Sequence, residues 1–422
     1  MSFFKSHRLM AILVMTMLAL PVVAQQNVPL TLAAAEDLAL AAEPGQLAML
    51  ARAEALQGRA LAASDLPDPQ LRVGLNNFPI ESGGFSTEGM TNVGVGLRQV
   101  FPAGKTREFD SQRLNLLADG AMQNAAARQR DVLLATRRAW LEVYYWIEAY
   151  QLVEESRAFV EDMVAITQSL YAVGRKSQQD VLRAELELSH LDERLIGIQQ
   201  QGASARAALG EWIGVDSLRA PADKLPNWQQ LPAISDLSEG LSQHPSLVAA
   251  EAQIQASEAG VGLAEQRSKP QWAMDLGYSY REGNLASGEP RSDFVSIGFS
   301  VGLPFFSKRA VDGTLTAALG ERSIARSEHE RTRRALHSQL LAAHSHWSEL
   351  TKRLSLYDDR ILDKSREHAE AALLAYQSDR GDFADVMRGF IDDLDTRNSY
   401  LRLQVERAQA YAVLANLGGL SR

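Results

Sequence analysis

The chain has 422 residues, no cysteine and a formal net charge of −9. A sequence without cysteine excludes disulfides, thiolate metal sites, thiol catalysis and a lipid anchor on an N-terminal Cys. The negative charge argues against nucleic acid as a partner. Aromatic residues make up only 7% of the chain, and the abundance of Ala, Leu, Glu, Gln and Arg is typical of long helices.

The first residues have the pattern of an export signal. Lys5 and Arg8 give a positive start, an apolar run follows from residue 9 to 23, and Ala24 is a small residue suited to signal peptidase. We expect a signal peptide over residues 1–24, cleaved after Ala24, and an exported chain without a lipid anchor. The alternative is a retained membrane anchor. The run is short for that role, because crossing a bilayer takes roughly 20 apolar residues.

The chain repeats itself with a long period. Tyr171-Ala-Val-Gly-Arg175 followed by Asp180-Val-Leu-Arg183 corresponds in register to Tyr376-Gln-Ser-Asp-Arg380 followed by Asp385-Val-Met-Arg388. Pro69-Gln70 likewise matches Pro270-Gln271. A period this long is too large for a solenoid and indicates a duplicated module. We expect a first repeat over residues 25–220 and a second over 221–422, with a linker marked by the prolines that open the second.

Each module is predicted to contain a helix, a strand pair, a very long helix, a turn and another long helix. In the first module we expect a helix from Thr31 to about Ser64, strands at about 70–78 and 92–101, and helices at about Gly104–Leu170 and Ser177–Trp212. In the second we expect a helix at about Leu237–Arg267, strands at about 271–281 and 294–303, and helices at about Val311–Tyr376 and Phe383–Leu417. At 1.5 Å per residue, each longest helix is about 100 Å long, which no compact globular domain needs.

The predicted strands alternate strictly between apolar and small or polar residues. In the first strand Leu71, Val73 and Leu75 alternate with Arg72, Gly74 and Asn76, and the other three have the same pattern. Period two over about ten residues, with one apolar face, is typical of transmembrane β-barrel strands. The alternative is a soluble hairpin that packs its apolar face on a core. Four such strands on an exported chain, beside helices of this length, favour the membrane interpretation.

Four strands cannot close a barrel. Open strand edges in lipid leave unpaired backbone groups, each costing several kcal/mol. We therefore expect several copies of the chain to contribute strands to one shared barrel. The narrow apolar stripes of the long helices fit a hollow helical tube, because each helix packs sideways on its neighbours and leaves two faces to solvent.

The chain resembles the TolC-like outer membrane efflux proteins, and its length is most similar to the branch paired with heavy-metal exporters of the cobalt-zinc-cadmium type. The resemblance covers nearly the whole exported chain. It is carried by Leu30-Thr-Leu-Ala33, Val100-Phe-Pro-Ala-Gly104, His244-Pro-Ser-Leu247, and Tyr171-Ala-Val-Gly174 leading to Asp180-Val-Leu182. Many members of that branch carry a lipidated N-terminal Cys, which this chain lacks.

The resemblance implies a mainly α fold with transmembrane β structure. It implies a homotrimer whose twelve-stranded barrel in the outer membrane of a Gram-negative bacterium continues as a periplasmic α-helical barrel. The implied function is the outer membrane channel of a tripartite efflux pump that exports small solutes, including heavy-metal cations. The implied partners are a periplasmic adaptor protein and an inner-membrane exporter of the RND or ABC type. The alternatives are a duct for type I protein secretion and, in a different class, a periplasmic coiled-coil or adhesin stalk without a pore.

By the resemblance, the two turns lie at the periplasmic tips of the helical hairpins, where the family has its closed entrance. Asp180 and Asp385 match the family's tip aspartates, and a ring of carboxylates would favour cations. Arg183 and Arg388 follow each Asp by three residues, so each shares the helix face of its Asp as an intrachain pair. We expect these four residues to form the periplasmic gate. The alternative is a pair of solvated ion pairs, each worth about a few tenths of a kcal/mol.

The turns themselves are candidates for contact with the adaptor. The candidate residues are Gly174, Arg175, Arg380 and Gly381. The second turn departs from the first, because Asp379 stands where the first has Gly174. Tyr171 and Tyr376 are candidates for packing the tips.

No enzyme or cofactor motif occurs in the sequence in the structural context that its chemistry requires. The pattern Gly298-Phe-Ser-Val-Gly302 matches Gly-Xaa-Ser-Xaa-Gly, but it falls inside the predicted strand at about 294–303 and not at a strand-to-helix turn. A phosphate loop and a His-Glu-Xaa-Xaa-His motif are lacking. His337, His344 and His346 lie on one predicted helix, but His346 is on a different face and no carboxylate stands at ligand spacing. We expect no catalytic residues, no metal site and no cofactor.

Overall fold

The computed structural model describes residues 28–41, 43–222, 224–378 and 380–418. The predicted signal peptide and the cleavage site at Ala24 lie outside these residues. The helices are α1 (Leu32–Leu40), α2 (Pro44–Ser64), α3 (Thr106–Ala172), α4 (Gln178–Ile213), α5 (Ile234–Ser242), α6 (Pro245–Gln266), α7 (Lys308–Leu356), α8 (Leu362–Gln377) and α9 (Phe383–Gly418). A short 3-10 helix, Gly214–Leu218, follows α4, and a π-helical turn, Tyr357–Ile361, joins α7 to α8. The strands are β1 (Gln70–Asn76), β2 (Asn92–Phe101), β3 (Gln271–Tyr280) and β4 (Phe294–Gly302).

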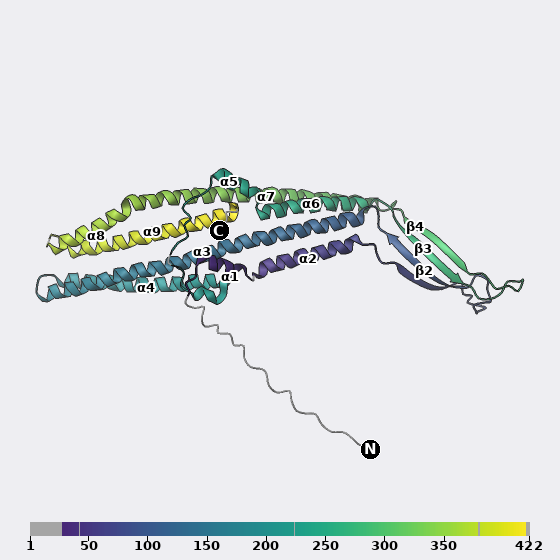
Figure 1. Cartoon of the computed structure of the whole chain (residues 1–422), viewed down its shortest axis with the longest axis horizontal. Helices are drawn as coiled ribbons and strands as arrows, with labels where there is room; N and C mark the ends of the chain where they lie inside the picture. The colour runs from purple at the N-terminus through teal and green to yellow at the C-terminus, as the bar shows by residue number, and fades with distance from the viewer. Residues whose placement is uncertain (1–27, 42, 223, 379, 419–422) are drawn as a thin grey trace, which may run out of the picture.

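The molecule is a long rod with the sheet at one end and the turns of both helical hairpins at the other (Figure 1). The short helices α1 and α5 and the C-terminal end of α9 lie near its middle. The longest helix, α3, has 67 residues, which at 1.5 Å per residue is about 100 Å. The predicted long helix of the first module is therefore confirmed.

The four strands form one antiparallel sheet in the order β1-β2-β3-β4. Each strand lies in a segment where the sequence alternation predicts it. The two hairpins belong to different modules and are joined through β2 and β3, where Val95 pairs with Tyr278 and Arg98 pairs with Asp275. Within the described residues, β1 and β4 are left as the two outer edges of the sheet.

Two predicted helices are each divided in two by a proline. The expected helix from Thr31 to Ser64 ends at Leu40, and α2 begins with Pro44, while Thr31 caps α1 as expected. The expected helix from Leu237 to Arg267 is likewise split between α5 and α6, which begins with Pro245. Proline has no N–H for the helix ladder and tolerates only the first helical turn. The prediction of single helices was therefore wrong at both places.

The long helix expected over Val311–Tyr376 is interrupted by the π-helical turn between α7 and α8. The Tyr400 hydroxyl on α9 donates a hydrogen bond to the Asp358 carboxylate in this turn at 2.6 Å. The Tyr357 ring stacks on Tyr400 with 6.1 Å between centroids. A π-turn inserts an extra residue into an α-helix, and these contacts hold it against α9.

The core is a thin line of contacts along the helices rather than a globular centre. Trp140 on α3 is 1% exposed, and its indole Nε1–H donates to the carbonyl of Leu30 at 2.9 Å. The Phe159 and Phe390 rings stack at 3.7 Å and join α3 to α9. Since α3 also packs on α4, the two hairpins lie side by side in one chain.

A buried ion pair fixes α1 against the middle of α3. The Arg137 guanidinium lies 2.6 Å from the Glu36 carboxylate, and the two side chains are 6% and 4% exposed. The Arg137 guanidinium also lies 5.6 Å from the ring centroid of Trp228, in the segment between the modules. Removing one partner of such a desolvated pair strongly destabilises the folded protein.

No helix in the described part of the chain has both the length and the apolar character that crossing a bilayer requires.

Candidate functional site

One face of the sheet is apolar and uncovered. Val73, Val295 and Phe299 are 69%, 72% and 68% exposed. Their neighbours on this face are exposed too: Leu71, Leu75, Val93, Val95, Leu97, Trp272, Met274, Leu276, Tyr278, Ile297 and Val301. Leaving a large aliphatic side chain in water rather than burying it forgoes about 1.5–3 kcal/mol. A hairpin packed on its own soluble core would cover these residues, so the alternative interpretation of the strands does not hold.

The opposite face of the sheet is built from small and polar residues. Gly94 pairs with Ser279, Gly96 with Gly277, and Asp275 with Gly298. One apolar and one polar face per strand is the pattern of a sheet with lipid on one side and water on the other. In the described part of the chain, β1 and β4 each keep one unpaired edge, and lipid does not tolerate unpaired backbone groups.

The turn of the first hairpin ends α3 in a Schellman motif. The Arg175 N–H donates to the Leu170 carbonyl and the Gly174 N–H donates to the Tyr171 carbonyl, both at 2.9 Å. Gly174 has a φ of 75°, a left-handed conformation that glycine adopts without steric cost. Gly174 and Arg175 are exposed at the very end of the rod. The sequence pattern at this tip thus specifies its backbone.

The turn of the second hairpin uses its glycine differently. The Arg380 N–H donates to the Ala375 carbonyl at 2.8 Å, which repeats the first bond of the Schellman motif. A Cβ on Gly381 would lie 3.0 Å from the Ala375 Cβ and 3.1 Å from the Tyr376 nitrogen. Gly381 therefore allows a close approach of the chain to the end of α8. Asp379, which replaces the glycine of the first turn, lies outside the described residues.

The expected ion pair of the first tip does not form. The Asp180 carboxylate accepts a hydrogen bond from the Ser177 N–H, and the Ser177 hydroxyl accepts one from the Asp180 N–H, both at 3.3 Å. This reciprocal capping box satisfies two N–H groups at the start of α4. Because the carboxylate is occupied there, it makes no ion pair with Arg183 in the described structure, and Arg183 lies exposed. The expected pairing of these two residues was wrong.

The expected ion pair of the second tip does form. The Arg388 guanidinium lies 3.1 Å from the Asp385 carboxylate, and the two side chains are 68% and 60% exposed. Both residues lie on the first turns of α9. A pair this exposed contributes about 0–1 kcal/mol to the stability of one chain. Its importance for function depends on what a neighbouring chain would place beside it.

The two tips of one chain are in contact. The Lys176 ammonium of the first turn lies 4.2 Å from the centroid of the Tyr376 ring, at the end of α8. Tyr376 is 4% exposed and packs edge-on against Phe383, whereas Tyr171 is 47% exposed. The packing role that we considered for both tyrosines therefore applies to Tyr376 alone. Nothing in the sequence pattern singled out Lys176, because a lone basic residue in a turn has no periodicity to mark it.

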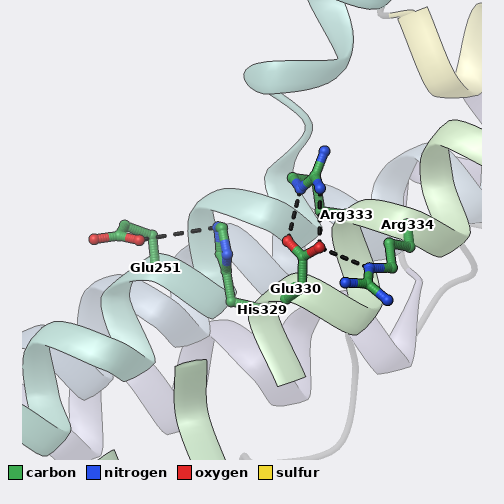
Figure 2. Close-up of polar contacts among 5 residues, drawn as sticks. All are labelled: Glu251, His329, Glu330, Arg333 and Arg334. Atoms are coloured by element: carbon green, nitrogen blue, oxygen red, sulfur yellow. Dashed lines mark hydrogen bonds and ion pairs between the residues drawn. The ribbon is translucent and has the colours of Figure 1, made fainter. Parts of the chain in front are cut away.

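His337, His344 and His346 all lie on α7. His337 and His346 are exposed, and no group of three or more metal-ligating side chains occurs among the described residues. Figure 2 shows the polar cluster that lies nearby on α7, where Arg333 and Arg334 hold the Glu330 carboxylate at 2.8 and 2.6 Å. These two hydrogen bonds lower the pKa of Glu330 to about 2.

His329, beside that cluster, has one carboxylate partner. Its Nε2 lies 3.9 Å from a Glu251 carboxylate oxygen on α6, an ion pair only when the imidazole is protonated (Figure 2). One carboxylate at this distance is not a coordination sphere, which needs several ligands at about 2 Å. The polar groups of this region form ion pairs within α7 and one contact between α7 and α6.

Comparisons with known proteins agree with this architecture. A family model described as Outer membrane efflux protein matches residues 237–420, which is nearly all of the second module. The cobalt-zinc-cadmium resistance protein CzcC of Cupriavidus metallidurans is 22% identical over 409 residues, with 93% of this chain and 90% of that protein covered. The outer membrane protein VceC of Vibrio cholerae has a similar structure, with a TM-score of 0.75 and 17% identity over 92% of this chain and 96% of that one.

A second solved structure, CusC, is described in terms of transmembrane channel formation. It matches with a TM-score of 0.71 and 18% identity, covering 91% of each chain. An uncovered apolar sheet with open edges, joined to helical hairpins as long as these, defines the class of TolC-like outer membrane channel folds. Residues 237–420 match the outer membrane efflux protein family, and the relative CzcC aligns with nearly the whole chain.

Proposed function

We propose that the chain is the outer membrane channel of a tripartite efflux pump, which exports small solutes from the periplasm or an inner-membrane pump to the exterior. One observation carries this proposal. The sheet presents an apolar face that its own chain leaves uncovered, with Val295 72% exposed, and it ends in two unpaired edges. Lipid against the face and identical strands against the edges satisfy both requirements at once.

Three copies of the sheet supply twelve strands, enough to close a barrel around an aqueous pore. The same symmetry brings three pairs of helical hairpins together below the barrel. Exposed apolar residues on α4 and α7 support side-by-side contact between copies there: Leu182, Leu186, Ile196, Ile324 and Leu341. The proposed assembly is a homotrimer whose barrel spans the outer membrane and whose helical tube reaches into the periplasm.

The periplasmic entrance is proposed at the hairpin tips. The gate residues are Asp180, Arg183, Asp385 and Arg388, and the adaptor would meet the turns at Gly174, Arg175, Arg380 and Gly381. Two features support this placement. The tips lie at the far end of the rod from the sheet (Figure 1), and Arg183 lies exposed without an ion pair in the described chain. It is therefore available to a carboxylate of a neighbouring copy.

The cargo is proposed to include heavy-metal cations. This rests on the relative named cobalt-zinc-cadmium resistance protein CzcC, which aligns with 93% of this chain. The partners are a periplasmic adaptor protein and an inner-membrane exporter of the RND or ABC type. A conduit has no need of a tight cargo site, so selection of the metal would belong to the exporter.

Conductance of the purified protein in planar lipid bilayers tests the channel and its gate together. The protein carrying both Asp385→Ala and Arg388→Ala should conduct more than the natural one, because the exposed pair would no longer hold the second hairpin at the entrance. A matched control is Asp363→Ala with Arg366→Ala, which removes an equally exposed i,i+3 pair from α8 (2.8 Å, 60% and 65% exposed). Equal conductance of the tip variant, the control and the natural protein would reject the gate.

The competing functions differ in assembly and in dependence on partners. A periplasmic stalk without a pore would insert into no bilayer and give no conductance, whatever the tip variants do. A secretion duct would conduct, but deleting its gene would abolish export of a protein substrate and leave metal tolerance unchanged. Metal tolerance of the deletion strain, with and without the natural gene on a plasmid, therefore separates metal efflux from secretion.

A further inference from the structure

The four strands contain three charged residues, and the fold brings all three together on one face of the sheet. They are Arg72 on β1, Arg98 on β2 and Asp275 on β3. The face is the small and polar one, because each residue lies at an alternate position to the exposed apolar side chains. β4 has no charged residue and contributes Ser300 to the same place. We call these four residues the sheet charge cluster.

Asp275 lies between two guanidinium groups. Its carboxylate oxygen is 3.2 Å from Arg72 and 3.8 Å from Arg98. The other end of the Arg98 guanidinium donates to the Ser300 hydroxyl at 3.1 Å. One carboxylate thus faces two permanently charged cations, and each chain retains a net charge of about +1 in the cluster.

The glycines of the polar face make this arrangement possible. Arg72 on β1 reaches Asp275 on β3, so its side chain crosses the intervening strand β2, where its register partner is Gly96. Asp275 in turn has Gly298 as its partner on β4. A Cβ on Gly96 would lie 3.1 Å from the Leu276 carbonyl oxygen, and a Cβ on Gly298 would lie 3.7 Å from the Asp275 Cβ. The two glycines therefore leave the sheet surface beside the charged side chains without side chains of its own.

The cluster is accessible to solutes. The side chains of Arg72, Asp275 and Arg98 are 55%, 33% and 28% exposed. The apolar side of the same sheet is the side suited to lipid, so the cluster lies on the side that would face the pore. Three copies would place six guanidinium groups and three carboxylates around one level of the barrel, near the ends of β1 and β2 that connect to helices.

We infer that the sheet charge cluster is a positively charged belt inside the barrel, which favours small anionic solutes over cations at this level of the pore. Rings of Arg or Lys are the general device by which pores favour anions and phosphate-bearing solutes. This inference rests on the proposed channel function and adds a selectivity element at the opposite end from the tip carboxylates. A metal cation would pass this belt more readily as an anionic complex than as a free ion.

The competing interpretation gives the cluster a purely structural role, as a clasp that fixes β1 against β3. The two roles respond differently to charge. A clasp depends on the Arg–Asp contacts and is weakened equally by removing either partner. A belt depends on net charge, so removing Asp275 and removing the two arginines must have opposite effects on selectivity.

The test measures the chloride-to-potassium permeability ratio from the reversal potential under a KCl gradient in planar bilayers. We expect Arg72→Gln with Arg98→Gln to lower the ratio, on the order of twofold in about 0.1 M salt, and Asp275→Asn to raise it. Both shifts should shrink at about 1 M salt, where the Debye length falls from about 10 Å to about 3 Å. The conservative pair Arg72→Lys with Arg98→Lys keeps the charge and should keep the ratio.

Assembly is checked separately by heat-modifiable mobility on gels, so that a variant that does not form the barrel is recognised. Unchanged ratios in assembled Gln and Asn variants, or shifts of the same sign in both, would overturn the belt. Failure of the proposed function looks different, because the natural protein and its tip variants would then give no conductance in any salt.

Discussion

The Lys176 ammonium lies 4.2 Å from the ring centroid of Tyr376, so the turn of the first helical hairpin touches the end of the second within one chain. The two residues lie in different predicted repeats, 25–220 and 221–422. The contact lies at the tip, where α9 also has the Asp385–Arg388 ion pair. It means that the second hairpin cannot move away from the first at the tip without separating a cation from an aromatic face.

Replacing Lys176 with Met should loosen this contact. Methionine keeps the length of the side chain and removes its charge. A cation–π contact is worth about 0.5–2 kcal/mol, with the larger values at desolvated rings, and the Tyr376 ring is 4% exposed. We expect a higher open fraction of the channel in planar bilayers. Lys364→Met is the matched control, because Lys364 pairs with Glu367 on its own helix at 2.6 Å and its side chain is 75% exposed. Identical open fractions for both variants would show that the tip contact does not restrain the entrance.

The two tip aspartates should respond differently to the same substitution. Asp180→Ala removes one half of the capping box of α4, which we expect to cost about 1 kcal/mol locally. Asp385→Ala removes an exposed ion pair, worth about 0–1 kcal/mol, and the acidic side chain in the first turn of α9, but no capping hydrogen bond that the structure shows. Hydrogen exchange of the peptides that follow each turn measures the local stability of the helix start. Exchange should speed up at the start of α4 in Asp180→Ala and change little at the start of α9 in Asp385→Ala. The reverse order would contradict the capping role.

The buried ion pair between α1 and α3 should be the most sensitive polar contact in the chain. Arg137→Met leaves the Glu36 carboxylate, 4% exposed, without its guanidinium, and breaking such a buried pair costs about 3–5 kcal/mol. The midpoint of heat-induced unfolding in detergent should fall accordingly. Arg326→Met, which removes a pair with Glu258 that is 57% and 46% exposed, should leave the midpoint nearly unchanged. If both substitutions changed the unfolding midpoint by similar amounts, burial would not be what makes the Glu36–Arg137 pair sensitive.

The attachment of α2 to α3 should depend on pH through Glu43. The hydrogen bond from the Arg128 guanidinium, at 2.8 Å, holds the pKa of Glu43 below its usual value. Because the folded state lowers this pKa, the contribution to stability is present above the ordinary glutamate pKa and is lost as the pH falls through the folded one. Arg128→Met should therefore lower the unfolding midpoint most at neutral pH.

The difference between Arg128→Met and the natural protein should narrow as the pH falls below the usual glutamate range. Comparing the two unfolding midpoints from neutral to acidic pH checks this. A difference that stays constant over that range would mean that Arg128 acts through packing on Trp212, whose ring centroid lies 5.7 Å away, rather than through the charge of Glu43.

Local sequence patterns were sufficient to predict the helices and strands and part of the structure of the hairpin tips. Alternation along Leu71, Val73 and Leu75 marked a strand, and the long run without proline marked α3. Gly174 marked a left-handed turn because few other residues adopt that conformation. The prediction was wrong where the rule that proline tolerates only the first turn of a helix was not applied, as at Pro44 and Pro245. It also failed at Asp180, where two local partners competed and the backbone N–H of Ser177 was preferred to Arg183.

The sequence by itself determined the strands, the long helices and the two-faced character of the sheet, because each of these is set by the spacing of neighbouring side chains. Only the tertiary structure decided that β2 pairs with β3, that Asp275 lies between Arg72 and Arg98, and that Lys176 contacts Tyr376. The contact of Arg72 with Asp275 joins residues 203 positions apart. No periodicity encodes such a contact, because it depends on how the two modules pack together in space.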